Sequence, residues 1–212
     1  MFRITVSIAD VLSSLKVEKI SHKDDFSWKE DLNSLINIEI SELSKEKKVI
    51  QHKNQNVNNL IIYSDDSKCE KTDNLKAGVF YIKNFSAENS ESLSWSLNLH
   101  TEMFDAELFA LKKAFKLAFN KIFFFTKDIW IFSDSQAAIQ RLQKSSLKTE
   151  QSHVLIIENW IEKIKTKHQI DIHLSWISGH MNITGNELAD QTAKKEAELQ
   201  QTNTESVVSL FY

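Results

Sequence analysis

A chain of 212 residues with 42% hydrophobic and 26% charged residues is long enough for one domain of ordinary size and an appendage. No apolar stretch approaches the roughly 20 residues of a membrane helix, and no basic segment precedes an apolar run near the N-terminus, so we expect an intracellular protein, nuclear or cytoplasmic, that is neither secreted nor bound to a membrane. The net charge of −3 argues against a strongly basic DNA-coating protein, and the single cysteine, Cys69, excludes an internal disulfide and a cysteine-based zinc cluster.

The first part of the chain predicts an extension to the main domain. Residues 1–58 alternate short apolar patches with charged stretches, which indicates partial helix, and residues 51–59 are a polar tract rich in Asn and Gln that is typical of a linker. We therefore predict a domain boundary near residue 59, a main domain over residues 59–199 and a tail over residues 200–212.

Regular periodicity begins after that boundary. Residues 60–63 form a short apolar run that predicts a buried strand, and the Ser-Asp-Asp-Ser that follows predicts a turn. Residues 77–85 and 93–99 alternate with a period of two around a polar loop and predict an antiparallel pair. The later pattern predicts a helix at residues 103–119 and a buried strand at residues 129–132, after which Ser133-Asp134-Ser135 opens a helix. A long amphipathic stretch at residues 154–164, a strand at residues 170–177 and a last helix from about residue 186 to 199 follow. One mixed sheet flanked by helices follows.

Two aspartates follow apolar strands of this pattern. Asp65 and Asp134 follow the runs at residues 60–63 and 129–132, each after a single serine. Open α/β sheets place ligands at the carboxyl ends of their strands, so the two carboxylates would meet if these strands are adjacent and parallel. A turn residue at Asp65 and a helix N-cap at Asp134 are equally good explanations for either residue taken alone.

Two further acids lie among apolar residues of predicted helices. Glu107 lies between Phe104 and Leu111 on the apolar stripe of its helix, and Asp190 lies near Ala189 in the last helix. A buried carboxylate is costly unless a cation or hydrogen-bond donors meet it, so a metal ion would explain both positions. The alternative is a side chain that reaches solvent from the edge of the stripe. Neighbouring Glu187 fits a solvent-facing acid of the first turn.

Three aspartates and one glutamate are the oxygen ligands that Mg²⁺ prefers, with Mn²⁺ as a substitute. Such a group can hold two ions about 4 Å apart, one activating water and one stabilising the leaving oxygen of a phosphodiester. The four acids therefore favour phosphoryl chemistry.

From about residue 60 to 197 the chain resembles type 1 ribonuclease H, in the form that ends the polyproteins of non-LTR retrotransposons. Four blocks carry the resemblance, in the family's order and on its element types, and the last is the most specific: Ile-Ile-Tyr-Ser-Asp-Asp-Ser at 61–67, Phe-Asp-Ala-Glu-Leu at 104–108, Ile-Phe-Ser-Asp-Ser-Gln-Ala-Ala at 131–138, and Trp-Ile-Ser-Gly-His-Met-Asn-Ile-Thr-Gly-Asn-Glu-Leu-Ala-Asp at 176–190.

The resemblance implies an α/β fold with a five-stranded mixed sheet, three strands antiparallel and then two parallel, flanked by helices. It implies hydrolysis of the RNA strand of an RNA–DNA hybrid by two metal ions. His180 matches a mobile histidine near the scissile phosphate, for which the pH range of an imidazole is suitable. The implied metal ligands are Asp65, Glu107, Asp134 and Asp190, and the implied substrate contacts are Asp66, Ser67, Gln136 and Asn186.

The chain departs from the family in three places. The family usually has glycine where this chain has Asp66, close to the RNA, and proline where it has Ser178. The lysine-rich handle of some members is missing between residues 139 and 169. Because phosphate contacts dominate such binding, affinity for the hybrid is expected to be low unless another segment supplies positive charge.

Three alternatives stand beside this interpretation. The Tyr-Ser-Asp-Asp at residues 63–66 matches a polymerase palm signature, but the 62 residues upstream leave no room for fingers. An integrase-type nuclease of the same fold would cut DNA, and the block at residues 176–190 argues against it. A decayed or co-opted binding module would keep the fold without activity. Protein partners are not indicated by the sequence.

Overall fold

The protein was analysed as a computed structural model, which describes residues 32–40, 58–68, 75–83, 86–97, 101–144, 151–179 and 183–195. All of these residues belong to one compact unit, Asp31–Tyr212. The predicted linker at residues 51–57, Cys69, His180 and the predicted tail lie outside the described residues. The predicted domain boundaries stay predictions.

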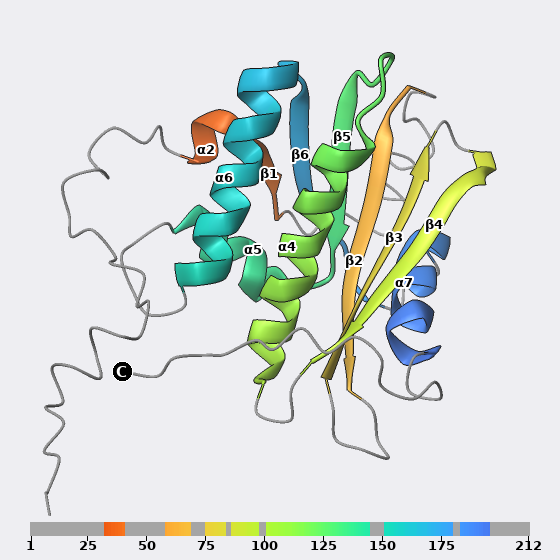
Figure 1. The fold of residues 1–212 in the computed structure, drawn as a ribbon. Coiled ribbons are helices and arrows are strands. Elements are labelled where there is room, and N and C mark those ends of the chain that lie inside the picture. Colours follow the sequence, from red (N-terminus) through yellow and green to blue (C-terminus); the bar gives the residue numbers. More distant parts are fainter. Residues whose placement is uncertain are drawn as a thin grey trace, which may run out of the picture. The chain divides into compact units, whose positions relative to one another are not determined.

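A six-stranded mixed sheet forms the centre of the fold, in the order β1-β6-β5-β2-β3-β4 (Figure 1). β1, β6, β5 and β2 are parallel to one another, and β2, β3 and β4 pair antiparallel. The strands are β1 Asn37–Glu39, β2 Leu60–Lys68, β3 Leu75–Lys83, β4 Ser86–Ser96, β5 Asp128–Ser133 and β6 Asp171–Trp176. The helices are α2 Leu32–Leu35, α4 Met103–Lys121, α5 Gln136–Gln143, α6 Gln151–His168 and α7 Thr184–Lys195.

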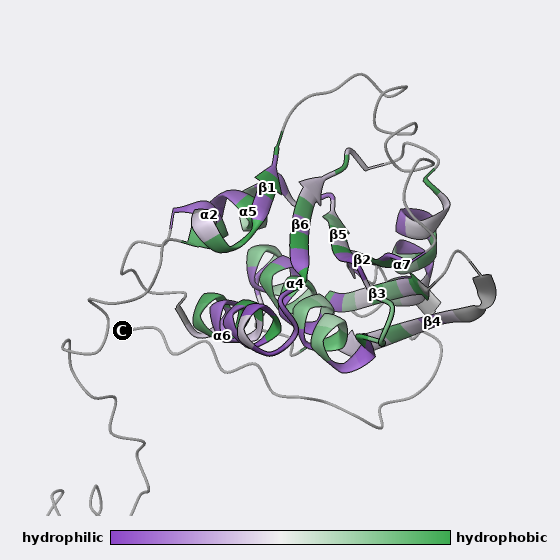
Figure 2. Ribbon diagram, turned by 90° about the horizontal axis from the view of Figure 1, so that it is seen from above, coloured by the Kyte–Doolittle hydropathy of each residue, from purple (hydrophilic) through white to green (hydrophobic). Residues whose placement is uncertain are grey.

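Helices cover both faces of the sheet (Figure 2). α4 packs on β2 and β3, and α6 packs on α4, while α7 packs on the opposite face over β2, β3 and β4. Strand alternation supplies a separate apolar cluster to each face: Leu60 and Ile62 of β2 face α4, whereas Ile61 and Tyr63 face α7. No described helix is long and apolar enough to cross a membrane.

The fold class predicted from the sequence is confirmed, with one strand more than expected. Asn37–Glu39 pairs in parallel with β6 and so adds a sixth strand at the edge of the sheet. The segment is too short for strand periodicity to show in its sequence. Buried Leu32 and Ile36 anchor it to the core beneath α6.

The turn predicted after residue 63 is wrong, because β2 continues to Lys68. The Ser-Asp-Asp-Ser segment pairs with β3, ending with Lys68 opposite Leu75. Only the pairing of β2 with β5 stops earlier, at Ser64 and Ser133. The polar residues of β2 therefore lie where one neighbouring strand has ended and the other continues, which leaves one side of the strand open.

Candidate active site

Two aspartates flank the point where parallel pairing stops. Ser64 of β2 and Ser133 of β5 are the last paired residues, and Asp65 and Asp134 follow them. Because both strands run in the same direction, the two residues come next to each other at the carboxyl edge of β5. The adjacent, parallel strands that their predicted proximity required are therefore present.

Asp134 is not the N-cap of the helix that follows, as one of the alternatives proposed. The capping residue of α5 is Ser135, whose Oγ accepts a hydrogen bond from the backbone N–H of Ala138 at 3.1 Å. The turn that carries Asp134 is held instead by Trp176, whose Nε1 donates to the Asp134 backbone carbonyl at 2.9 Å. The half-buried carboxylate of Asp134 is thus not used in capping α5.

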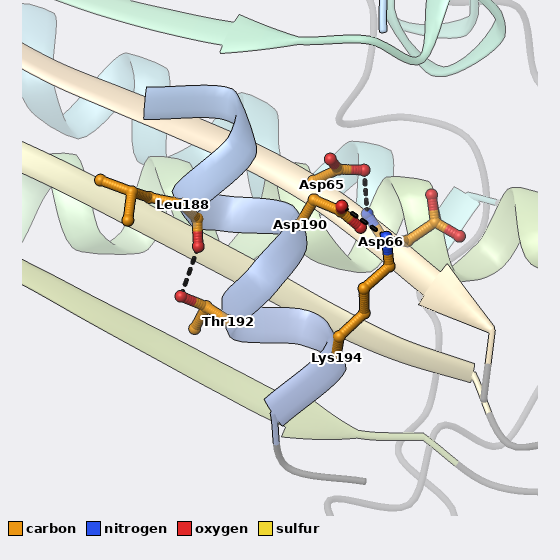
Figure 3. A network of polar contacts seen from close by, with 6 residues as sticks. All are labelled: Asp65, Asp66, Leu188, Asp190, Thr192 and Lys194. Carbon is orange, nitrogen blue, oxygen red and sulfur yellow. Dashed lines mark hydrogen bonds and ion pairs between the residues drawn. The ribbon is translucent and has the colours of Figure 1, made fainter. Parts of the chain in front are cut away.

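Asp190 reaches the same region from α7. A Cβ at Gly78 of β3 would lie 2.3 Å from the backbone oxygen of Ala189, so only glycine allows α7 this close to the sheet. Gly78 pairs with Asp65, and Asp190 follows Ala189 on the helix. The carboxylates of Asp65 and Asp190 lie close together in Figure 3.

Burial and charge act together on Asp65. Only 8% of this residue is exposed, and loss of hydration, followed by repulsion from Asp134, Asp190 and Asp66, raises the pKa of its carboxyl to about 8. A single opposing contribution comes from the backbone N–H of Asp66, which donates to Asp65 Oδ1 at 2.8 Å (Figure 3). Such an acid weakens the fold when it ionises, so its position calls for a cation or a chemical role.

The side chain of Asp66 lies on the opposite face of β2, which α4 covers. Its partner on β3 is Ala77, which packs with Ala106 of α4, and Glu107 is the next residue of that helix. Burial first, and then the carboxylates of Glu107 and Asp134, raise the pKa of Asp66 to about 7. Asp66 therefore adds a fifth carboxylate, on the side of the sheet where Glu107 lies.

Glu107 and Asp190 each have a protein partner. Glu107 is half-buried between buried Ala106 and Leu108, and its Oε2 accepts a hydrogen bond from Ser135 Oγ at 2.6 Å. Asp190 forms an ion pair with Lys194, one helical turn later, with Nζ 2.5 Å from Oδ2 (Figure 3). Both side chains are therefore oriented by their own surroundings.

The loop after β6 also reaches the site. A Cβ on Gly179 would lie 3.3 Å from Asp134 Oδ2, so this backbone passes directly over the carboxylate. Gly179 immediately precedes His180 in the chain. The described part of the loop therefore ends beside the carboxylate of Asp134.

A family model for RNase H matches residues 57–198, which is more than half of the chain. The chain belongs to the RNase H family. No curated protein matches it. The mixed sheet with α4 and α6 on one face and α7 on the other agrees with that membership. The palm interpretation of residues 63–66 is thereby excluded for this segment, because it lies on the first strand of the matched domain.

The chemistry of these RNase H donors fits a hard divalent cation. All of them are carboxylates, and burial, followed by repulsion from Asp134, Asp190 and Asp66, raises the pKa of Asp65, which a bound cation would lower again. Among the described residues, no three His, Cys, Asp or Glu side chains lie close enough together to ligate one ion as they stand.

The predicted substrate contacts differ in exposure. Gln136 is exposed at the first residue of α5, and Asp66 and Ser67 are half-buried. Asn186 is 7% exposed within α7, one turn before Asp190, and its buried Oδ1 accepts no hydrogen bond among the described residues. Their roles, and that of His180, stay predictions.

Sequence reasoning missed two residues of the site. Ser135 bonds to Glu107 although 28 residues separate them, and no local pattern shows that contact. Lys194 follows Asp190 at the i,i+4 spacing that favours ion pairs on a helix, so this pair could have been found.

Proposed function

We propose that the protein is an endonuclease that hydrolyses the RNA strand of RNA–DNA hybrids. The observation that carries this proposal is the burial of Asp65 beside Asp134 and Asp190 at the open edge of β2, within a domain of the RNase H family. Nothing in the packing of the fold requires acids there. Membership in the family supplies the class of substrate and reaction.

In this proposal Asp65, Glu107, Asp134 and Asp190 would hold Mg²⁺ or Mn²⁺. The bound ions would neutralise the carboxylates, activate water and stabilise the leaving oxygen of the phosphodiester. Asp65 lies in β2 just past the last residue paired with β5, and Asp134 directly follows β5, so the end of the central parallel pair holds both residues. Glu107 and Asp190 approach from the two helical layers.

Selection of the hybrid would depend on its shape. The 2′-hydroxyls in the shallow minor groove distinguish the RNA strand and are accessible to polar side chains. Exposed Gln136, two residues after Asp134, is well situated to contact that groove. Such recognition tolerates many sequences, because it does not depend on base edges.

A labelled-substrate assay tests the proposal. Hybrid, duplex RNA and duplex DNA are incubated with Mg²⁺ or Mn²⁺ and with the wild type, Asp134→Asn or Glu187→Gln. Glu187 is an exposed acid of the first turn of α7 and serves as the matched control. We expect both wild type and the control to cut only the hybrid, and Asp134→Asn to be inactive. Cutting of duplex DNA contradicts the proposal and favours the integrase alternative.

A second candidate function is binding without cleavage. It is favoured by Asp66 in place of glycine and by carboxylates that do not yet form a common ligand set. Binding of the hybrid without any cutting, with either metal, is the result that this candidate predicts. Origin from a retrotransposon, and residence in the nucleus or cytoplasm, remain part of the proposal and await a genomic and a localisation experiment.

A further inference from the structure

The hydroxyl of Ser135 joins two parts of the site. Ser135 is 6% exposed, and its Oγ donates to Glu107 Oε2 at 2.6 Å while it accepts from the Ala138 N–H at 3.1 Å. A serine hydroxyl has one proton to donate, so Glu107 receives it and the helix N-terminus uses an acceptor position. The orientation of this hydroxyl is therefore fixed by both partners.

The contact links Glu107 to the turn that carries Asp134. Ser135 is the next residue after Asp134, and its own backbone N–H donates to Ser133 Oγ at 3.2 Å. Hydrogen bonds from a hydroxyl to a carboxylate are short and strong, and 2.6 Å lies in that range. The side chain of Glu107 has several rotatable bonds, and the hydrogen bond from Ser135 restricts rotation about them.

Capping alone does not require this arrangement. An N-cap needs only an acceptor, and glycine is tolerated there at small cost. The bond to Glu107, which belongs to a different helix, requires in addition that Ser135 Oγ carries a proton to donate. Outer partners that orient the ligands of a metal commonly change metal affinity when they are removed.

We infer that Ser135 is a positioning residue that orients the carboxylate of Glu107 for divalent cations through its hydroxyl. The inference rests on the proposed function, because that proposal makes Glu107 a metal ligand. In this inference Ser135 binds neither the substrate nor the ions itself. Its effect must therefore pass through Glu107.

The test compares four variants by calorimetric titration with Mn²⁺ and by urea unfolding. Ser135→Ala and Ser135→Gly both remove the donor, but glycine preserves more of the capping stability than alanine. We expect both to bind Mn²⁺ roughly tenfold more weakly, although their unfolding midpoints differ. Ser135→Thr should bind as the wild type does. Ser133→Ala, which removes a buried hydroxyl from the same turn without touching Glu107, should lower the midpoint and leave Mn²⁺ affinity unchanged.

A double-mutant cycle shows whether the effect passes through Glu107. In a Glu107→Gln background, Ser135→Gly should cause no additional loss of Mn²⁺ affinity. Unchanged or tighter Mn²⁺ binding in Ser135→Gly, or additive losses in the cycle, overturns the inference. So does a wild type that binds no Mn²⁺.

The two proposals fail in different ways. A wild type that binds Mn²⁺ but does not cut the hybrid contradicts the proposed function and leaves the titration of the Ser135 variants decisive. A wild type that cuts the hybrid, with Ser135→Gly binding Mn²⁺ equally well, contradicts only the role of Ser135.

Discussion

Asp65 and Asp66 are neighbours in the chain, yet their carboxylates lie on opposite faces of β2. Asp65 pairs with Gly78 under α7, beside Asp190, and Asp66 pairs with Ala77 under α4, beside Glu107. The alternation of a β-strand makes this unavoidable. Two successive acids therefore place a carboxyl group in both layers that border the site.

Asp66→Gly should strengthen binding of the hybrid. The substitution removes a half-buried carboxylate close to Glu107 and Asp134, where it repels a phosphate backbone as well as its neighbours. Above about pH 8 Asp66 is ionised even with its pKa raised to about 7, and removal of a charge interaction of about 1 kcal/mol should lower the dissociation constant roughly fivefold at low salt. Fluorescence anisotropy with a labelled hybrid measures it. Glu187→Gln removes the same charge from an exposed position and should have a smaller effect; an equal effect means that Asp66 acts only through net charge.

Asp65→Asn should stabilise the fold most at alkaline pH. The pKa of Asp65 is raised from 3.8 to about 8, so between these values the unfolded chain carries the charge and the folded protein does not. Stability attributable to Asp65 is complete below about pH 4 and declines as pH rises to about 8. Relative to the wild type, the variant should gain about 2 kcal/mol or more between pH 4 and pH 9.

Urea unfolding in a metal-free buffer at both pH values checks this prediction. The comparison uses Asp171→Asn as its control, because an ion pair with Lys165 lowers the pKa of that aspartate and its pH dependence has the opposite sign. A gain that is the same at pH 4 and pH 9 shows that Asp65 ionises normally in the folded protein.

The carboxyl-edge aspartates could be predicted because local sequence determines them. An apolar run followed by an acid marks the end of β5 at Asp134 and the end of the pairing of β2 with β5 at Asp65, and the two strands are parallel neighbours. The continuation of β2 to Lys68 could not be predicted, because its polar residues favour a turn and only the pairing with β3 keeps them extended.

The contacts that orient the acids depend on tertiary packing. The bond from Ser135 to Glu107 requires α4 to lie over the turn after β5, and no pattern within either segment specifies that arrangement. The edge strand Asn37–Glu39 is likewise stabilised by β6, more than a hundred residues away, and its own sequence is too short to show alternation.

His153→Leu should remove a source of acid sensitivity from the core. His153 is 7% exposed at the start of α6, packs edge-on against Phe109, and has a buried Nδ1 that forms no hydrogen bond among the described residues. Burial, aided by the charge of Lys112, lowers the pKa of His153 from 6.5 to about 4. Below pH 6.5 the imidazole of His153 is therefore protonated in the unfolded chain but stays neutral in the folded protein. The free energy of unfolding consequently declines as pH falls towards about 4.

Thermal unfolding at about pH 5 and pH 7.5 tests the histidine. The variant should be more stable relative to the wild type at the lower pH, by about 1–2 kcal/mol. Lys112→Met should reduce the acid sensitivity only in part, because burial is the larger cause of the lowered pKa. Equal pH dependence in wild type and His153→Leu contradicts the prediction.

Gly78→Ala should displace α7 and with it Asp190. The added methyl would lie 2.3 Å from the Ala189 oxygen and 2.8 Å from the Ala193 nitrogen, both backbone atoms that cannot turn aside. Overpacking of this kind costs about 1–3 kcal/mol, and the movement that relieves it carries Asp190 away from Asp65. We therefore expect a lower urea midpoint together with loss of hybrid cleavage under conditions where the variant is still folded. Gly179→Ala, whose methyl would meet only the Asp134 side chain, at 3.3 Å, within the described part of the chain, should unfold near the wild-type midpoint. A Gly78→Ala protein as stable as the wild type shows that α7 can shift freely on the sheet, and Asp190 would then not be held in place by the close approach at Gly78.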